Sequence, residues 1–303
     1  MVIGCNPKKK EKNSEDNSRQ DTLEVRHVKL DTTTRKDTLG FNLLQNGVEP
    51  MPLPIIDGIP EKEGFDISSE TDSELLIEPK IMDEPQDSII IPLADAPLED
   101  FPFNIAGKIE VEFGGGKVYT CSCQFVAKYI LITAAHCIKL GSEEAKRITF
   151  FLKYNKGSYE KSYAIEDMVY WSSYTNVGSY DDYAFLKVGE NKEVPNYWLG
   201  IASAPTSRRT NSMGYPGNIK GGEVLQNIKG YTDGRIPYGS YYYMTEIPFG
   251  AGSSGGAWFN EDGYIVGINS FTTSDTKNTM FSSYLGKDDL VFKLFGEAKN
   301  RFE

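Results

Sequence analysis

Gly252-Ser253-Ser254-Gly255-Gly256 comes directly before two short apolar runs, residues 257–259 and 264–270, which are joined by Asn260-Glu261-Asp262-Gly263. Both runs are rich in residues that favour strands. The Asn, Asp and Gly residues between them are typical of a tight hairpin turn. This stretch therefore predicts that Ser254, which is flanked by glycines, is followed by β-structure and not by a helix.

The same pattern extends over the rest of the chain from Ile105 onward. Short apolar or alternating runs, rich in Val, Ile, Tyr, Phe and Thr, are broken by Gly, Asn, Asp and Pro. Only residues 287–302 have helical spacing of their apolar side chains. We therefore expect an all-β domain over residues 101–303, built as two small barrels and closed by a C-terminal helix. The expected strands are residues 108–113, 118–125, 129–133, 147–154, 183–188, 210–214, 222–232, 241–246, 257–259 and 264–270.

The formal charge of -11 belongs to the N-terminal third of the chain. Residues 57–100 contain 14 Asp or Glu against 2 Lys, whereas residues 101–303 contain 21 acidic and 21 basic residues. The expected folded domain is thus nearly neutral, and the overall acidity says little about its substrate. No basic patch indicates a nucleic-acid partner, and we expect none.

Residues 1–100 combine dense charge with few apolar side chains, which favours disorder because little surface can be buried against the cost of ordering the chain. We interpret them as a largely disordered tether or propeptide, with residues 89–103 lying against the following domain. Val2-Ile3-Gly4-Cys5 resembles the end of a bacterial lipoprotein signal, so Cys5 is a possible lipidation site and membrane tether. No long apolar run precedes Cys5, and chance similarity stays an equal alternative.

The chain contains only two histidines, His27 and His136. A nucleophilic serine needs a partner that accepts and releases a proton near neutral pH, and histidine is the side chain suited to this. His27 lies in a polar stretch with no packing pattern, whereas His136 lies within Thr133-Ala134-Ala135-His136-Cys137. His136 is therefore the candidate base.

Two other serine-hydrolase arrangements are excluded by the order of these residues. Residues 252–256 also fit the Gly-x-Ser-x-Gly turn of α/β-hydrolases, where a helix follows the serine and the histidine comes later in the chain. Here no histidine follows Ser254. The subtilisin order requires an aspartate motif before His136, and no convincing one is present.

Three blocks, residues 133–137, 182–186 and 252–256, resemble in sequence and order the signatures of trypsin-like (chymotrypsin-fold) serine peptidases. The resemblance spans roughly residues 105–302. It implies that Ser254 is the nucleophile, that His136 is the general base and that Asp182 orients the imidazole. Gly252 and Ser254 would supply the backbone N–H groups of the oxyanion hole. Asp181, which competes with Asp182, is expected to be a solvated charge at a strand edge.

The resemblance also implies a disulfide between Cys121 and Cys137, and with it an extracytoplasmic location, either secreted, periplasmic or lipid-anchored. Cys123 could replace Cys121 in this bond or stay free. A zinc site of Cys121, Cys123, His136 and Cys137 is a less favoured alternative, since adjacent His and Cys ligands are awkward. We expect neither a metal nor a cofactor.

Within the family the sequence is most similar to the bacterial glutamyl-endopeptidase-like (V8-like) branch, through Gly214-Tyr215-Pro216-Gly217. The implied substrate-binding residues are Phe249, Gly250, Ala251, Asn269, Ser270, Phe271 and Thr272, with residues 270–272 lying beside the substrate backbone and Ser270 able to bond Asp182. That branch has a histidine where this chain has Asn269 and a threonine where it has Phe249. The resemblance therefore implies an uncharged primary pocket, selective for neither Glu nor Lys/Arg.

These observations predict a serine endopeptidase that acts on protein or peptide substrates through an acyl-enzyme. The alternative is a catalytically silent or latent peptide-binding pseudoprotease that is gated by the N-terminal arm. The oligomeric state is not indicated by the sequence.

Overall fold

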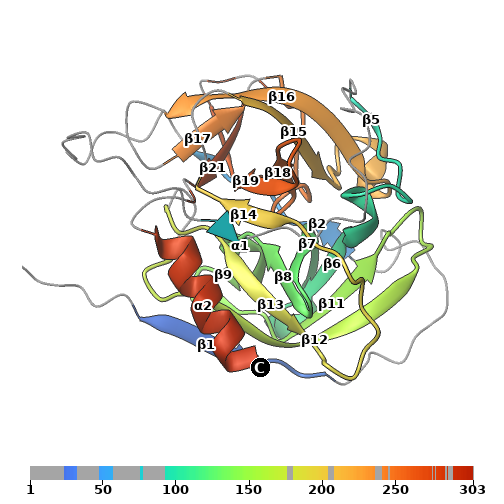
Figure 1. Cartoon of the computed structure of the whole chain (residues 1–303). Helices are drawn as coiled ribbons and strands as arrows, with labels where there is room; N and C mark the ends of the chain where they lie inside the picture. The colour runs from blue at the N-terminus through green and yellow to red at the C-terminus, as the bar shows by residue number, and fades with distance from the viewer. Residues whose placement is uncertain are drawn as a thin grey trace, which may run out of the picture.

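A computed structural model describes residues 24–32, 48–56, 76–77, 93–175, 180–203, 208–235, 241–244, 246–274, 276, 278–283, 285 and 289–302. Two β-sheets lie one above the other and α2 (Leu290–Phe302) packs beside the lower one (Figure 1). The expected all-β class with a C-terminal helix is confirmed.

The first sheet is a closed barrel of six strands in the order β12-β11-β6-β7-β8-β13, and β13 pairs again with β12. Phe125, Phe150 and Tyr163 fill its interior with ring centroids 5.6–6.2 Å apart. Buried residues alternate with half-buried ones along β11, as expected for a barrel wall. The strands are β6 (Ala106–Glu112), β7 (Val118–Ala127), β8 (Ile130–Thr133), β11 (Arg147–Leu152), β12 (Lys161–Trp171) and β13 (Ala184–Val188).

The second sheet runs in the order β21-β17-β16-β15-β18-β19-β14. The backbone of Phe281 in β21 forms hydrogen bonds with the backbone of Ser270 and Phe271, the residues that follow β19. The strand at the edge of the sheet thus lies next to the end of β19, so this sheet is also curved into a barrel-like form. Its strands are β14 (Gly200–Ala202), β15 (Arg208–Gly214), β16 (Gln226–Arg235), β17 (Tyr241–Met244), β18 (Ala257–Phe259), β19 (Tyr264–Ile268) and β21 (Met280–Ser283). The hairpin predicted at residues 257–270 is thus formed by β18 and β19.

Short elements complete the two halves. They are the 3-10 helices η2 (Phe103–Ile105), η3 (Gly114–Gly116) and η4 (Lys220–Gly222), the helix α1 (Ala135–Ile138), and the strands β9 (Lys139–Leu140), β10 (Glu143–Glu144) and β20 (Thr272–Thr273). In α2 the buried residues include Leu290, Val291, Leu294 and Phe295, which agrees with the helical spacing of apolar side chains over residues 287–302, and Phe295 contacts Phe185 of β13. Neither α1 nor α2, the α-helices of the described residues, is long and apolar enough to cross a membrane.

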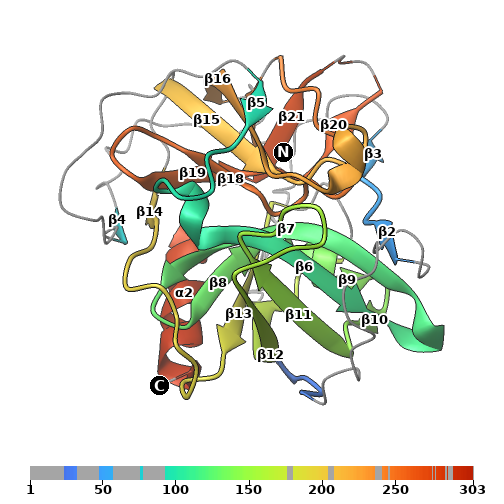
Figure 2. The same cartoon turned by 90° about the vertical axis from the view of Figure 1, so that its right-hand side faces the viewer.

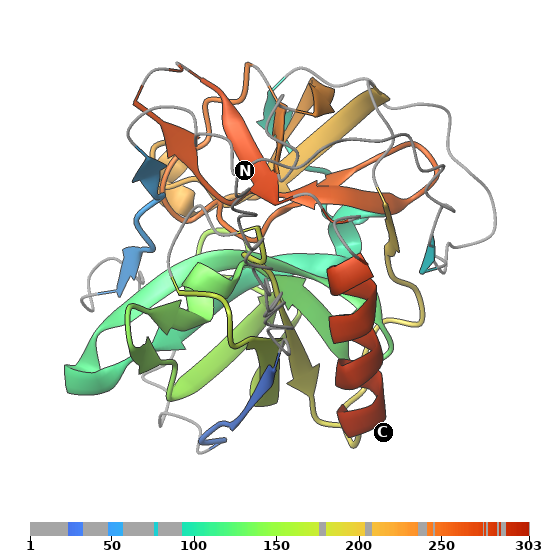
Figure 3. The ribbon, with the colours of Figure 1, turned by 90° about the vertical axis from the view of Figure 1, so that its left-hand side faces the viewer.

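Five short strands come from the first hundred residues; four of them extend the two sheets, and β3 (Ile55–Ile56) forms a separate two-stranded sheet with β20. β1 (Val25–Lys29) pairs with β12, β2 (Val48–Pro50) with β7, β4 (Leu76–Ile77) with β14, and β5 (Ala94–Asp95) with β16. The last pairing agrees with the expected docking of residues 89–103, of which 93–103 are described. Figure 3 shows β1 in blue under the first barrel, apart from β2 and β3. The sequence did not indicate any of these strands.

Candidate active site

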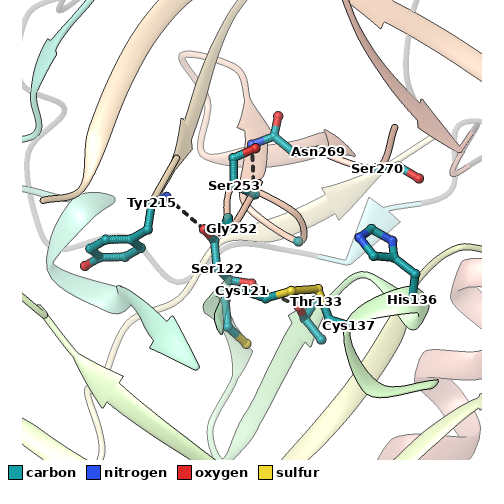
Figure 4. The surroundings of a disulfide bond; sticks show 12 residues. Cys121, Ser122, Thr133, His136, Cys137, Tyr215, Gly252, Ser253, Asn269 and Ser270 are labelled. Atoms are coloured by element: carbon teal, nitrogen blue, oxygen red, sulfur yellow. Dashed lines mark hydrogen bonds between the residues drawn. A yellow bond between two sulfur atoms is a disulfide. The ribbon is translucent and has the colours of Figure 1, made fainter. Parts of the chain in front are cut away.

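His136 lies on α1, one turn of helix that follows directly after β8. The neighbouring Cys137 is joined to Cys121 of β7 by a disulfide, which fixes this turn to the barrel wall (Figure 4). His136 is 4% exposed, so its imidazole is held inside the protein.

Asp182 holds His136 through two contacts. Its Oδ2 is 2.8 Å from Nδ1 of the imidazole, and its Oδ1 accepts the backbone N–H of His136 at 2.9 Å. The Ser270 hydroxyl also donates to Oδ2. Because an ionised carboxylate only accepts hydrogen bonds, Nδ1 carries the proton and Nε2 of a neutral ring is left with its lone pair.

The charge state of Asp182 follows from the same contacts. Asp182 is fully buried, which by itself would raise its pKa. His136 and the hydrogen bonds from His136 and Ser270 outweigh this effect, so the pKa of Asp182 lies below its usual value. The residue is therefore a buried, ionised carboxylate aimed at the imidazole.

Ser254 lies in the turn between Gly252 and β18 and is fully buried. Its carbonyl oxygen accepts the N–H of Ser122 at 2.8 Å, next to the disulfide that fixes His136. Neither Ser254 Oγ nor His136 Nε2 has a hydrogen-bond partner within the described part of the chain. The structure thus joins His136, Asp182 and Ser270, while the hydrogen bond between Ser254 and His136 is not formed.

The loop that carries Ser254 requires glycine at two positions, one on each side of the serine. Gly252 and Gly255 have φ values of +86° and +80°, a region that favours glycine. A Cβ at Gly252 would lie 2.7 Å from the carbonyl oxygen of Tyr215, which is too close for any real contact. The tight turn on either side of Ser254 therefore depends on both glycines.

Ser122 is a site residue that the sequence did not reveal. Its hydroxyl donates to the carbonyl of Gly252 at 3.0 Å and accepts the N–H of Tyr215 at 2.9 Å (Figure 4). Gln124, two residues along the same strand, donates to the carbonyl of Gly255 at 3.0 Å. β7 therefore holds the serine loop through side chains that belong to no motif.

Asn269 holds the other side of the loop. Its amide nitrogen donates to the carbonyls of Met213 and Ser253, and its oxygen accepts from Ser212 and Trp258. Asn269 is fully buried and all four of these bonds are internal. Its side chain therefore positions the loop that carries Ser253.

The remaining residues expected at the primary pocket lie close to this loop. Phe249 is 4% exposed and belongs to a buried apolar cluster. Asn218, which the sequence did not indicate, accepts the N–H of Gly250 and donates to the carbonyl of Pro248. These two bonds fix residues 248–250. Phe271 is buried against Phe281, with ring centroids 5.0 Å apart.

Two expectations about neighbouring residues are corrected or settled by the structure. Asp181 is fully buried and accepts a hydrogen bond from Ser173, so the expected solvated charge is wrong. Cys121 is the partner of Cys137, and Cys123 is a buried free thiol whose pKa is raised by burial. Because the disulfide uses both sulfurs, the alternative zinc ligand set does not form. Cys5 lies outside the described residues.

Residues 121–268 match the family model of the trypsin-like peptidase domain. The chain carries a trypsin-like serine peptidase domain. This match covers the disulfide, His136, Asp182 and Ser254, and it agrees with the closed barrel described above. The domain is therefore that of a hydrolase, a serine endopeptidase, whose substrates are proteins or peptides.

Solved structures support the same assignment. The protease Anisep from Arthrobacter nicotinovorans is 26% identical, with a TM-score of 0.52, and the match covers 60% of this chain and 90% of that one. A thermostable serine protease, AL20, from an extremophilic microorganism is also 26% identical, with a TM-score of 0.54 and coverage of 61% and 94%. A Glu endopeptidase at 18% identity, with a TM-score of 0.55 and coverage of 68% and 97%, shares the fold. No curated protein sequence matches the chain.

Proposed function

We propose that this peptidase cuts peptide bonds through Ser254, His136 and Asp182. Ser254 Oγ attacks the carbonyl carbon while His136 Nε2 takes its proton, and the same proton then passes to the leaving nitrogen as the C–N bond breaks. Water, activated by His136, hydrolyses the resulting ester and restores the serine. The N–H groups of Gly252 and Ser254 stabilise the oxyanion in both steps.

The observation that carries this proposal is the pair of contacts between Asp182 and His136, at 2.8 and 2.9 Å, inside a fully buried site. Such a pair fixes the ring orientation and leaves Nε2 as the basic atom. Ser254 and His136 are both anchored to β7, through Ser122 and Cys121, which supports their action on one substrate.

A fluorophosphonate probe tests this mechanism, because it reacts with a serine that is activated by a base and an oxyanion hole. We expect a covalent adduct on the peptide that contains Ser254, and none in the Ser254→Ala variant. Absence of an adduct in the full chain, and also in the Leu53→Asp variant introduced in the next subsection, would indicate the alternative, a peptide-binding pseudoprotease.

We propose that the primary pocket takes an uncharged residue before the cut. Phe249 belongs to a cluster with Met244 and Ile247, and Leu53 packs against this cluster. The polar atoms of Asn269 are used inside the protein, so they offer no partner to a substrate carboxylate. Peptides that differ only at this residue test the idea: Leu should be cut at least about tenfold faster than Glu or Lys.

The location of the protein and its tether are also proposals. The Cys121–Cys137 disulfide supports an extracytoplasmic site, since such bonds persist in oxidising compartments. We propose residues 101–303 as the peptidase domain and residues 1–100 as a tether or propeptide, with Cys5 as a lipid anchor. Cell fractionation, with and without Cys5→Ala, tests the anchor: the variant should move from the membrane to the soluble extracytoplasmic fraction.

A further inference from the structure

Residues 48–56, here called the arm, cross from β7 of the first sheet to β20 in the second half of the molecule (Figure 2). The arm begins as β2, parallel to β7, with Pro50 opposite Thr120. It ends as β3, parallel to β20, with Ile55 opposite Thr272. Between these two strands it passes over the loop that carries Ser254.

Three backbone hydrogen bonds fix the arm to this cleft. The Gly252 N–H donates to the Met51 carbonyl at 3.0 Å, and the Met51 N–H donates to Thr120 at 2.9 Å. The Thr272 N–H donates to the Pro54 carbonyl at 2.9 Å. Gly252 is one of the two proposed oxyanion donors, so the Met51 carbonyl already occupies the place where a substrate carbonyl would bind.

The side chains of the arm fill the same cleft. Met51 is 2% exposed, and Leu53 packs against the apolar cluster that contains Phe249. Ile55, by contrast, is 69% exposed. Together with the complete burial of Ser254, this arrangement leaves the nucleophile without access to a second peptide.

The direction of the arm is opposite to that of a substrate, an argument that rests on the proposed function. The proposed function places the residue before the cut in the pocket at Phe249, and we extend it by placing the other residues before the cut along residues 270–272, the stretch that the family resemblance sets beside the substrate backbone. The arm instead places its later residues, 54–56, there and its earlier residues, 48–50, on the far side of Ser254. If Ser254 attacked the Met51 carbonyl, the Met51–Pro52 bond would have to break, with the Pro52 nitrogen as the leaving group. In the reversed arm this nitrogen lies on the side where the acyl part of a substrate would lie, and His136 does not deliver a proton there.

We propose that residues 48–56 are a built-in inhibitor that binds the substrate cleft in reverse, so that it blocks the site without being cut. Displacement of the arm then activates the enzyme. The contacts are made by residues of one chain, so the block acts within the molecule and does not depend on protein concentration.

Leu53→Asp in the full chain tests the proposal, with Ile55→Asp as the matched control. A charge at the partly buried Leu53, against the apolar Phe249 cluster, weakens the arm, whereas the same charge at the exposed Ile55 does not. We expect fluorophosphonate labelling of Leu53→Asp to be at least about tenfold faster than that of the native chain, with Ile55→Asp within about twofold. Thermal unfolding of each variant reports whether the domain is intact.

Hydrogen exchange at the amides of Gly252 and Thr272 provides a readout that needs no catalysis. We expect both amides to be protected in the native chain and in Ile55→Asp, and to exchange faster in Leu53→Asp. Equal labelling of all three proteins, or unchanged exchange in Leu53→Asp, overturns the inhibitory arm and leaves the proposed function standing. Faster exchange without labelling in any protein supports the arm and overturns the proposed catalysis.

Discussion

At the scale of single residues, small polar side chains do the positioning in this site. Ser270 supports the carboxylate of Asp182, Ser122 holds the loop at Gly252, and Asn269 holds it at Ser253. Ser253 itself takes part in a further neutral hydrogen bond. Its hydroxyl donates to the carbonyl of Gly250 at 2.8 Å. The loop is thus kept in shape by neutral hydrogen bonds and needs no ion pair.

Ser270→Ala should weaken both the site and the fold. The hydrogen bond from Ser270 lowers the pKa of Asp182, so it stabilises the folded protein above the usual aspartate pKa and ceases to do so as pH falls through the lower folded value. We expect a loss of about 2 kcal/mol in the free energy of unfolding at pH 7. The difference from the native chain should shrink below about pH 4.

Urea unfolding between pH 3 and pH 7 measures this difference, with the exposed Ser142→Ala as control. In an arm-displaced background the hydrolysis rate should also fall, by about tenfold. A stability difference that does not depend on pH would mean that Ser270 acts by packing alone.

The site residues that the sequence could indicate are those that lie in local motifs. The blocks at 133–137 and 182–186 placed His136 and Asp182 together, and the structure gives their hydrogen bonds. Ser122 and Asn218 could not be found in this way, because their partners are 30 to 130 residues away and no local pattern marks them. Asp181 was misread because its burial comes from packing, which adjacent sequence does not show.

At the scale of elements, β12 and β1 show where pattern analysis fails. β12 is the longest strand of the described chain, yet Glu166 and Asp167 interrupt its apolar pattern and a bulge occurs at the same place. Asp167 is fully buried and is paired with Lys29 of β1 and Arg301 of α2, each at 2.9 Å. A charge inside a strand is acceptable here only because two distant elements neutralise it.

The docking of β1 on β12 should weaken in mild acid. Burial and the charge of Arg301 lower the pKa of His27 below its usual value of 6.5, although Asp167 and Glu297 act in the opposite direction. The unfolded chain therefore binds a proton more readily, and stability falls as pH drops below 6.5 toward the lower folded pKa. His27→Gln, which cannot be protonated, should lose this dependence.

Urea unfolding of the two proteins at pH 7.5 and pH 5 tests the prediction. We expect the native chain to lose stability relative to His27→Gln at the lower pH. A native chain that gains stability relative to the variant in acid would contradict the prediction. It would show that Asp167 and Glu297 raise the pKa of His27 by more than burial and Arg301 lower it.

At the scale of the whole molecule, the two halves are joined by α2, by the N-terminal strands and by a buried polar bridge. Phe295 brings the helix that follows the second sheet back onto the first barrel (Figure 1). Lys108 of β6 is 3% exposed and donates to the carbonyl of Gly222 at 2.9 Å and to Glu223 at 3.0 Å. The proposed site takes His136 from the first half and Ser254 from the second, so its shape depends on how firmly the two halves are joined.

Lys108→Met should loosen this joint. Burial lowers the pKa of Lys108, while Glu223 raises it, so the cation is kept by its partner. Removing the ammonium leaves Glu223 partly buried with the Tyr154 hydroxyl as its remaining side-chain donor at 2.6 Å. We expect a loss of about 3 kcal/mol in the free energy of unfolding, because a buried charge that loses its partner is costly.

The double variant Lys108→Met/Glu223→Gln separates the buried charge from the lost packing. If the cost comes from the unpaired carboxylate of Glu223, the double variant should regain about half of the lost stability, and the two single effects should not add. Glu223→Gln alone is the matched control, since it keeps the size of the side chain. If the losses in the free energy of unfolding of the two single variants simply add, Lys108 and Glu223 are not coupled. The two halves are then held together by α2 and by the N-terminal strands, without this bridge.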